Sequence, residues 1–219
     1  MKDQKTKRMV LIAMLAAVSY LVVSIFKLFP IQVIPALPFL SFEPKDVIIT
    51  IGGFILGPLS SAAISLLVSL LEMVTISGTG PIGALMNLVS TCAFACTAAF
   101  IYKKKRTIGG AVIGLVAGSV TMVAVMLLWN WLITPLYMGV DRKAVEALLL
   151  PGFLPFNALK AGLNSALTIW LYKPLTTALG RTGLIEAKPK RPTKLGIYLF
   201  AAALLISCIL LLLVLQGKL

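Results

Sequence analysis

Long apolar segments separated by short polar or charged stretches dominate this chain. Most of them are as long as the ~20 residues that an α-helix needs to cross a bilayer. The pattern therefore predicts an all-α integral membrane protein, whose apolar segments cover roughly residues 9–29, 45–76, 81–102, 108–137, 152–176 and 195–215.

The second apolar segment, 45–76, is too long for one span and contains a break. Gly57 and Pro58 lie inside it. Proline cannot continue a helix interior, and the glycine before it permits a turn. The segment is therefore predicted to form two helices, near 45–57 and 58–76.

Basic residues gather in three linkers. These hold 14 of the 20 lysines and arginines but only Asp3 and Glu186 of the seven acidic residues: Lys2 to Arg8, Lys103 to Arg106, and Lys173 to Lys194. The positive-inside rule places such linkers in the cytoplasm. An even number of crossings must then separate consecutive linkers, which gives six spans.

The chain is accordingly predicted to have three parts. Residues 1–178 form a six-span membrane domain, and residues 179–194 form a basic cytoplasmic linker. Residues 195–219 add a seventh, C-terminal transmembrane helix. The N-terminus is expected in the cytoplasm and the C-terminus outside the cell.

Composition narrows the function classes. The chain has 59% hydrophobic residues, a mean hydropathy of +1.02 and a net charge of +13. Because the basic residues lie between apolar segments, they indicate topology rather than nucleic-acid binding. The chain has no histidine, which excludes Ser-His-Asp chemistry and HExxH zinc sites. Its three cysteines lie in apolar stretches and make a poor metal site without further ligands.

The first outer loop, from Lys27 to Asp46, is rich in proline yet apolar. Its apolar side chains would be unfavourable in water, so the loop is predicted to fold over the membrane face as a lid. A disordered connector is the alternative. The charges that flank the lid, Lys27, Glu43, Lys45 and Asp46, are interpreted as solvated, and Glu72 is expected to face water.

Three polar side chains in the outer half of the spans are candidate ligand contacts: Asn130, Asn157 and Lys160. Ionisable groups inside a membrane segment are functional candidates by default. An amide offers donors and an acceptor, and an ammonium offers donors only. With the neighbouring tryptophans, Phe156 and the lid as apolar walls, the set suits a planar amphipathic heterocycle.

Each of these residues also has a structural interpretation. Lys160 could extend its ammonium to the outer surface. Trp129, Trp131 and Tyr137 could be interfacial aromatic residues. Asn130 or Asn87 could simply hydrogen-bond to a neighbouring helix. Ala13 and Ala17 of the first span permit close helix packing, either within the chain or against another membrane subunit.

Four sequence motifs carry a family resemblance. They are Ala13-xxx-Ala17 in the first helix, GGFILGP at 52–58, WNWLITPLYMG at 129–139 and LPFNALKAGLN at 154–164. Over roughly residues 8–178 the chain resembles the substrate-binding S components of energy-coupling-factor (ECF) vitamin transporters, most closely the riboflavin-specific ones.

The resemblance implies a six-helix S-component-like bundle that holds the vitamin at its outer side, under the first loop; the seventh helix is an addition to it. Asn130, Asn157 and Lys160 would contact the isoalloxazine ring, and Ala13 and Ala17 would meet the transmembrane coupling subunit. The full set of expected substrate-binding residues is Asn130, Asn157, Lys160, Phe156, Trp131, Asn87, Phe39 and Leu40.

The implied activity is riboflavin uptake driven by two ATPase subunits on the coupling subunit. Riboflavin is then cargo and no cofactor is expected. The chain has no GxxxxGK[ST] loop and is predicted not to be an enzyme. Two alternatives stay open: an S component for another vitamin, and a stand-alone secondary transporter. A membrane enzyme is disfavoured because no helix carries paired carboxylates.

Overall fold

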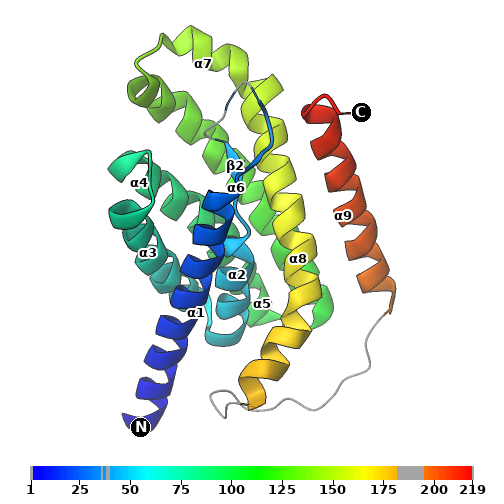
Figure 1. The fold of residues 1–219 in the computed structure, drawn as a ribbon. Helices are drawn as coiled ribbons and strands as arrows, with labels where there is room; N and C mark the ends of the chain where they lie inside the picture. The colour runs from blue at the N-terminus through cyan, green and yellow to red at the C-terminus, as the bar shows by residue number, and fades with distance from the viewer. Residues whose placement is uncertain (1, 36, 38–39, 182–194, 219) are drawn as a thin grey trace.

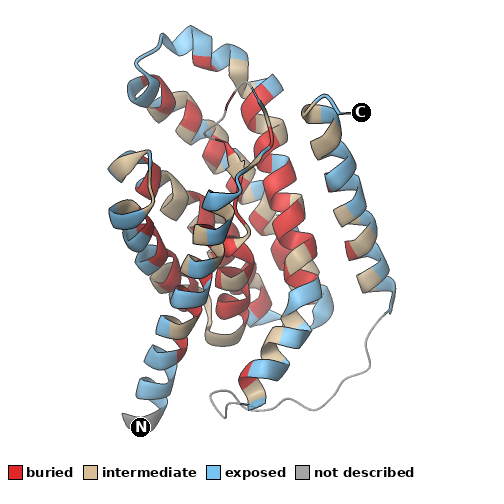
Figure 2. Ribbon diagram, viewed as in Figure 1, coloured by how far each residue is buried: buried red, intermediate tan, exposed pale blue. Residues whose placement is uncertain are grey.

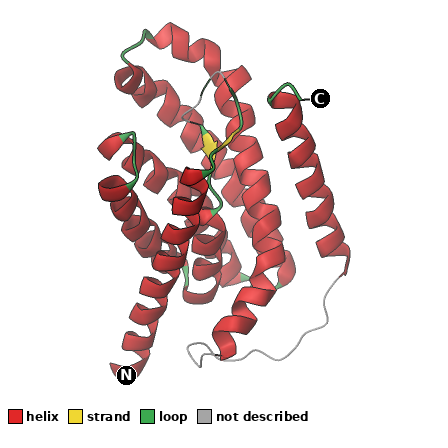
Figure 3. Cartoon of the chain, viewed as in Figure 1, coloured by secondary structure: helices red, strands yellow, loops and turns green. Residues whose placement is uncertain are grey.

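The computed structural model describes residues 2–35, 37, 40–181 and 195–218. The described chain is a bundle of helices that run up and down alongside one another, with one short strand pair in the connection between the first and second helices (Figures 1 and 3). The elements are α1 (Lys2–Leu28), β1 (Ile31–Gln32), β2 (Ser41–Phe42), α2 (Lys45–Leu56), α3 (Pro58–Thr75), α4 (Gly80–Thr91), η1 (Cys92–Cys96), α5 (Thr97–Lys104), α6 (Ile108–Met138), α7 (Arg142–Leu148), η2 (Leu149–Phe153), α8 (Leu154–Arg181) and α9 (Leu195–Leu215).

The predicted break in the second apolar segment is confirmed. Gly57 has φ +98°, a left-handed conformation that side chains disfavour, and its N–H donates to Gly53 O at 2.7 Å. Pro58 then opens α3 at its first turn, where a missing N–H leaves no hydrogen bond unmade. The turn folds α2 back against α3.

Five helical segments of the described chain are long and apolar enough to cross a membrane: Gln4–Leu28, Pro58–Thr75, Gly80–Lys104, Ile108–Met138 and Leu195–Leu215. The predicted spans at α2 and α8 are not among these five segments. The 12 residues of α2 extend only ~18 Å at 1.5 Å per residue, short of a ~30 Å hydrocarbon core. Most of α2 and the centre of α8 are buried among the other helices, so neither depends on lipid contact (Figure 2).

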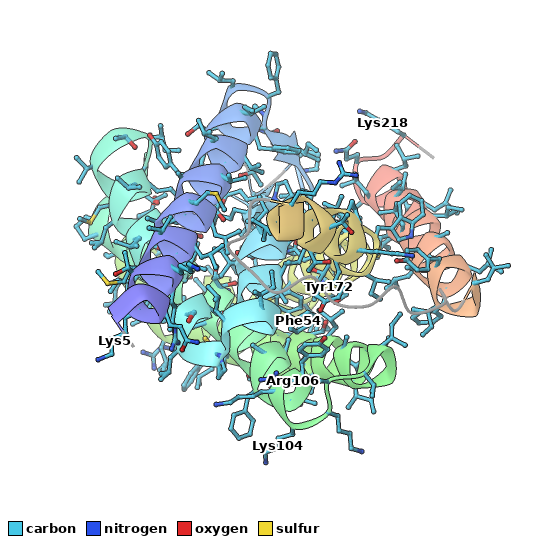
Figure 4. All side chains as sticks on the ribbon, turned by 90° about the horizontal axis from the view of Figure 1, so that it is seen from below. Lys5, Phe54, Lys104, Arg106, Tyr172 and Lys218 are labelled. Carbon is cyan, nitrogen blue, oxygen red and sulfur yellow. The ribbon has the colours of Figure 1, made fainter. Side chains whose placement is uncertain are left out.

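The inner half of the bundle is held by close backbone packing and aromatic contacts. A Cβ at Gly114 or Gly118 of α6 would lie 2.6 or 2.5 Å from a carbonyl oxygen of the neighbouring helix. Small residues at such positions let helices approach closely in lipid. Nearby, the Phe54 and Tyr102 rings lie 4.5 Å apart, and Tyr102 is hydrogen-bonded to Tyr172 at 2.9 Å (Figure 4).

The first outer loop forms a lid, as predicted. Strands β1 and β2 pair antiparallel, with Ile31 opposite Phe42. Val33, Leu37 and Leu40 between them are buried. The loop therefore packs onto the bundle instead of exposing its apolar side chains to water.

Two features of the outer loops were not predicted. The short helix α7 occupies a stretch that the sequence analysis treated as loop, and the lid contains a two-residue strand pair. At the inner end, α8 continues to Arg181, and the rest of the predicted linker lies outside the described residues. Helix α9 coincides with the predicted seventh helix.

Candidate ligand-binding site

A partly open cavity of about 70 Å³ lies beneath the lid. Its walls come from the lid, α4, α6 and α8, together with Lys27 at the end of α1. The residues that line it are Lys27, Leu40, Ser41, Glu43, Thr79, Ile82, Gly83, Met86, Asn87, Ser90, Met126, Trp129, Asn130, Ile133, Thr134, Tyr137, Phe156, Asn157 and Lys160. Asn130, Asn157 and Lys160, which lie far apart in the sequence, thus share one cavity.

Helix α6 contributes one face at helical spacing, which includes Trp129 and Asn130. Asn130 is 1% exposed and donates its amide to Met126 O at 2.7 Å. Thr134 Oγ1 donates to Asn130 Oδ1 at 2.9 Å. An amide nitrogen carries two protons, so Asn130 keeps a second donor for a ligand.

The placement of Trp131 in the binding site is wrong. Successive helical residues point about 100° apart, and Trp131 lies off the face that lines the cavity. Its indole N–H donates to Glu146 Oε1 at 2.9 Å, and the Arg142 guanidinium lies 4.9 Å from its ring centre. Trp129 supplies the cavity's tryptophan instead.

Helix α8 contributes Phe156, Asn157 and Lys160, just after the π-helical turn η2. Asn157 donates to Phe153 O at 2.7 Å, which orients its amide. Lys160 is only 5% exposed, and its Nζ lies 3.4 Å from Asp46 Oδ2. Lys160 is therefore an internal cation rather than one extended to the outer surface.

Asp46, the anion that pairs with Lys160, is buried, so its interpretation as a solvated charge is wrong. Asp46 is 1% exposed, whereas the sequence analysis interpreted it as a solvated loop charge. The short helix α2 carries its first turn into the bundle, where Asp46 accepts hydrogen bonds from Thr91 at 2.7 Å and Asn164 at 3.4 Å. Burial of this carboxylate is tolerated because a cation and two donors surround it.

A second charge cluster stands beside the first, and it corrects the interpretation of three more residues, Glu43, Lys45 and Glu72, which are buried, whereas Lys27 stays exposed as expected. Lys45, 1% exposed, pairs with Glu43 at 2.8 Å and also with Glu72. Lys27 reaches Glu43 at 3.1 Å from the end of α1. Glu72 is 2% exposed rather than water-facing, and Asn87 donates to it at 3.0 Å. Charges at the ends of predicted helices thus pair inside the bundle.

The pKa of Glu43 shows which influence prevails at the edge of the lid. Burial alone raises this pKa, but the nearby charges of Lys45, Lys27 and Lys160 outweigh burial and lower the pKa to about 2. Glu43 therefore stays ionised at any physiological pH.

The arrangement suits recognition rather than reaction. The lysines and carboxylates neutralise one another in pairs, and the amides at the cavity can present donors and acceptors to an uncharged ring edge. Among the described residues, no group of three or more cysteine, aspartate or glutamate side chains could hold a metal ion. With the lid in this position the cavity is smaller than typical ligand sites of ~300–1,000 Å³, so a ring-sized ligand requires the lid to move.

The remaining predicted contacts divide into three groups. Leu40 and Asn87 line the cavity. Phe39 lies outside the described residues. Ala13 and Ala17 are exposed on α1, so close packing within the described chain does not occupy them. No sequence signal pointed to Asp46 or Glu43 as neighbours of the site.

Comparison with known proteins now decides the family. A family model described as ECF transporter, substrate-specific component, matches residues 7–172. The chain belongs to this family. It is a multi-pass membrane protein and a substrate-binding component of a transporter.

Relatives of known name support this assignment. Riboflavin transporter RibU of Staphylococcus aureus is 30% identical over 184 residues, which are 81% of this chain and 95% of that protein. Riboflavin transporter FmnP of Bacillus subtilis is 28% identical, over 71% of this chain and 85% of that protein. A solved structure of the S component of a bacterial ECF transporter superposes with a TM-score of 0.67 and 29% identity, over 80% of this chain and 98% of that chain.

Proposed function

We propose that this S component captures riboflavin at the outer face of the membrane for uptake by an ECF transporter. The observation that carries the proposal is that Asn130, Asn157 and Lys160, all buried, line one cavity under the lid. Relatives at 28–30% identity that bear the name riboflavin transporter support the choice of ligand.

In this proposal the amides of Asn130 and Asn157 and the Lys160 ammonium contact the carbonyls and ring nitrogens of the isoalloxazine. Phe156 and Trp129 provide flat apolar surfaces for the ring. The lid opens to admit the ligand and closes over it.

The proposal also assigns orientation and partners. In this proposal the N-terminus lies in the cytoplasm and the C-terminus outside, and the basic linkers support this orientation. A transmembrane coupling subunit with two ATPase subunits supplies the energy, and this chain docks on it through α1. Support for the docking face comes from Ala13 and Ala17, which are small and exposed on α1.

The proposal predicts that protein purified from riboflavin-containing cells is yellow and fluorescent. The ligand-free protein should quench flavin fluorescence on titration, with one riboflavin per chain. Mass spectrometry of the released ligand checks its identity.

Two outcomes would contradict the proposal. A different vitamin in the purified protein would exclude riboflavin as the ligand. Riboflavin transport by the protein alone in liposomes, without ATPase subunits, would indicate a stand-alone transporter.

A further inference from the structure

Helix α9 presents one face to the bundle and the other outward (Figure 1). Ala201 and Cys208 are buried, and Leu204, Leu212 and Leu215 are half-buried on the same face. This spacing of three, four and seven residues is that of one side of a helix. The opposite face, which includes Ile206, Leu210 and Val214, is exposed.

The buried face of α9 packs closely on α8. A Cβ at Gly162 would lie only 2.7 Å from Cys208 Sγ, so the two helices meet there with no room for a side chain. Gly162 lies two residues after Lys160 on the helix that carries the cavity residues. Helix α9 therefore packs against α8, the helix that carries Phe156, Asn157 and Lys160.

The outer half of α9 also shares an apolar core with the lid. Val33, Leu37 and Phe42 of the lid belong to the same buried cluster as Cys208, and Leu212, Leu215 and other half-buried residues pack against this cluster. Just beyond the end of α9, Gln216 Nε2 donates to the backbone carbonyl of Gln32 in strand β1 at 2.6 Å. The C-terminal segment thus reaches the lid through a direct hydrogen bond, and α9 shares one buried apolar cluster with the lid.

We propose that α9 is a brace that holds the lid closed over the cavity and so sets how fast ligand enters and leaves. The identity of the ligand rests on the proposed function, but the brace itself rests on the contacts between α9, α8 and the lid. Helix α9 lies on the opposite side of the bundle from α1, so the brace leaves the proposed docking face of α1 free (Figures 1 and 4). The family match ends at residue 172, before α9 begins, so the brace is additional to the matched family fold.

The brace has a distinctive kinetic consequence. At about 70 Å³ the cavity is too small for a ring-sized ligand, so the lid must move before such a ligand binds. A contact that stabilises the closed lid lowers the fraction of empty protein able to bind, and it also slows release from loaded protein. Weakening the brace should therefore raise the association and dissociation rates together and change the affinity less than either rate.

The test compares two full-length triple variants in lipid nanodiscs. The brace variant carries Leu212→Ala, Leu215→Ala and Gln216→Ala. The control carries Ile206→Ala, Leu210→Ala and Val214→Ala, on the exposed face of the same helix. Stopped-flow riboflavin fluorescence should show both rates about tenfold faster in the brace variant and unchanged in the control. Rates equal to the control, or an increase in the dissociation rate alone, would overturn the brace.

A second measurement does not depend on riboflavin. Amide hydrogen exchange in ligand-free protein reports lid opening at Val33 and Leu40, whose N–H groups are bonded within the lid. Exchange should be faster in the brace variant than in the control. If the unmodified protein fails to bind riboflavin, the proposed function fails while hydrogen exchange still tests the brace.

The single variant Gln216→Ala removes only the polar contact and covers the case in which the triple variant does not fold. It should raise lid exchange by about two- to tenfold. Lid exchange unchanged from the unmodified protein would overturn the role of this contact.

Discussion

Helices α8 and α9 pack side by side, yet they differ in which side chains they bury. Helix α8 carries Asn157, Lys160 and Asn164, and all three are buried. Helix α9 is the most apolar of the candidate spans, yet only Ala201 and Cys208 are buried along it. Burial in this protein therefore does not follow hydrophobicity.

The difference follows from the surrounding solvent. Lipid accepts apolar side chains as readily as a protein core does, so α9 can leave most of its surface outside. Lipid cannot satisfy amides or charges, so α8 must turn them inward towards partners. A polar helix at the centre and an apolar helix at the edge are two results of one constraint.

The largest expected effect comes from removing the anion that neutralises Lys160. Asp46→Ala leaves a buried ammonium without its counter-ion, and breaking a buried ion pair costs about 3–5 kcal/mol of unfolding free energy. Thermal unfolding in detergent measures the loss. The double variant Asp46→Asn with Lys160→Met removes both charges and should recover much of it; equal stability of Asp46→Ala and the unmodified protein would show that α8 does not depend on this pair.

A smaller effect is expected from the ligand contacts. Asn157→Ala should weaken riboflavin binding by about 1–3 kcal/mol, since a buried ligand group would lose its hydrogen bond. Fluorescence titration measures the affinity. Ile206→Ala on the exposed face of α9 is the control and should leave affinity unchanged.

The two tryptophans of α6 offer a matched pair. Trp129→Ala should weaken riboflavin binding because the Trp129 ring lines the cavity. Trp131→Ala should leave the affinity unchanged because the Trp131 indole lies off the cavity and donates a hydrogen bond to Glu146. Stacked aromatic pairs contribute about 0.5–1.5 kcal/mol. The same titration checks both variants, and the reverse order of effects would contradict the assigned cavity face.

Glu43 is expected to make stability depend on pH only in the acid range and to add no pH dependence near neutrality. Its pKa is lowered from 4.5 to about 2, so its ion pairs stabilise the fold fully above pH 4.5 and lose that contribution as the pH falls towards 2. The stability advantage of the unmodified protein over Glu43→Gln should therefore be constant from pH 7 to 5 and shrink below pH 4.5. Unfolding temperatures measured across this range check the sign; an advantage that grows on acidification would contradict it.

Much of the architecture followed from local sequence. The apolar segments marked the helices, Gly57-Pro58 marked the turn between α2 and α3, and the Pro-rich loop folded as the predicted lid. Asn130, Asn157 and Lys160 could be singled out because polar side chains in apolar helices are unfavourable without partners.

Long-range contacts decided the rest. The sequence alone does not show that α2 is short and enclosed. Lys45 and Asp46 were therefore interpreted as solvated charges, although both are only 1% exposed. The choice between Trp129 and Trp131 depended on the rotation of α6, which only its packing sets. The long apolar segments thus determined which parts of the chain form the membrane helices, whereas the pairing of buried charges and the contact of α9 with the lid needed the tertiary structure, because both join residues far apart in the chain.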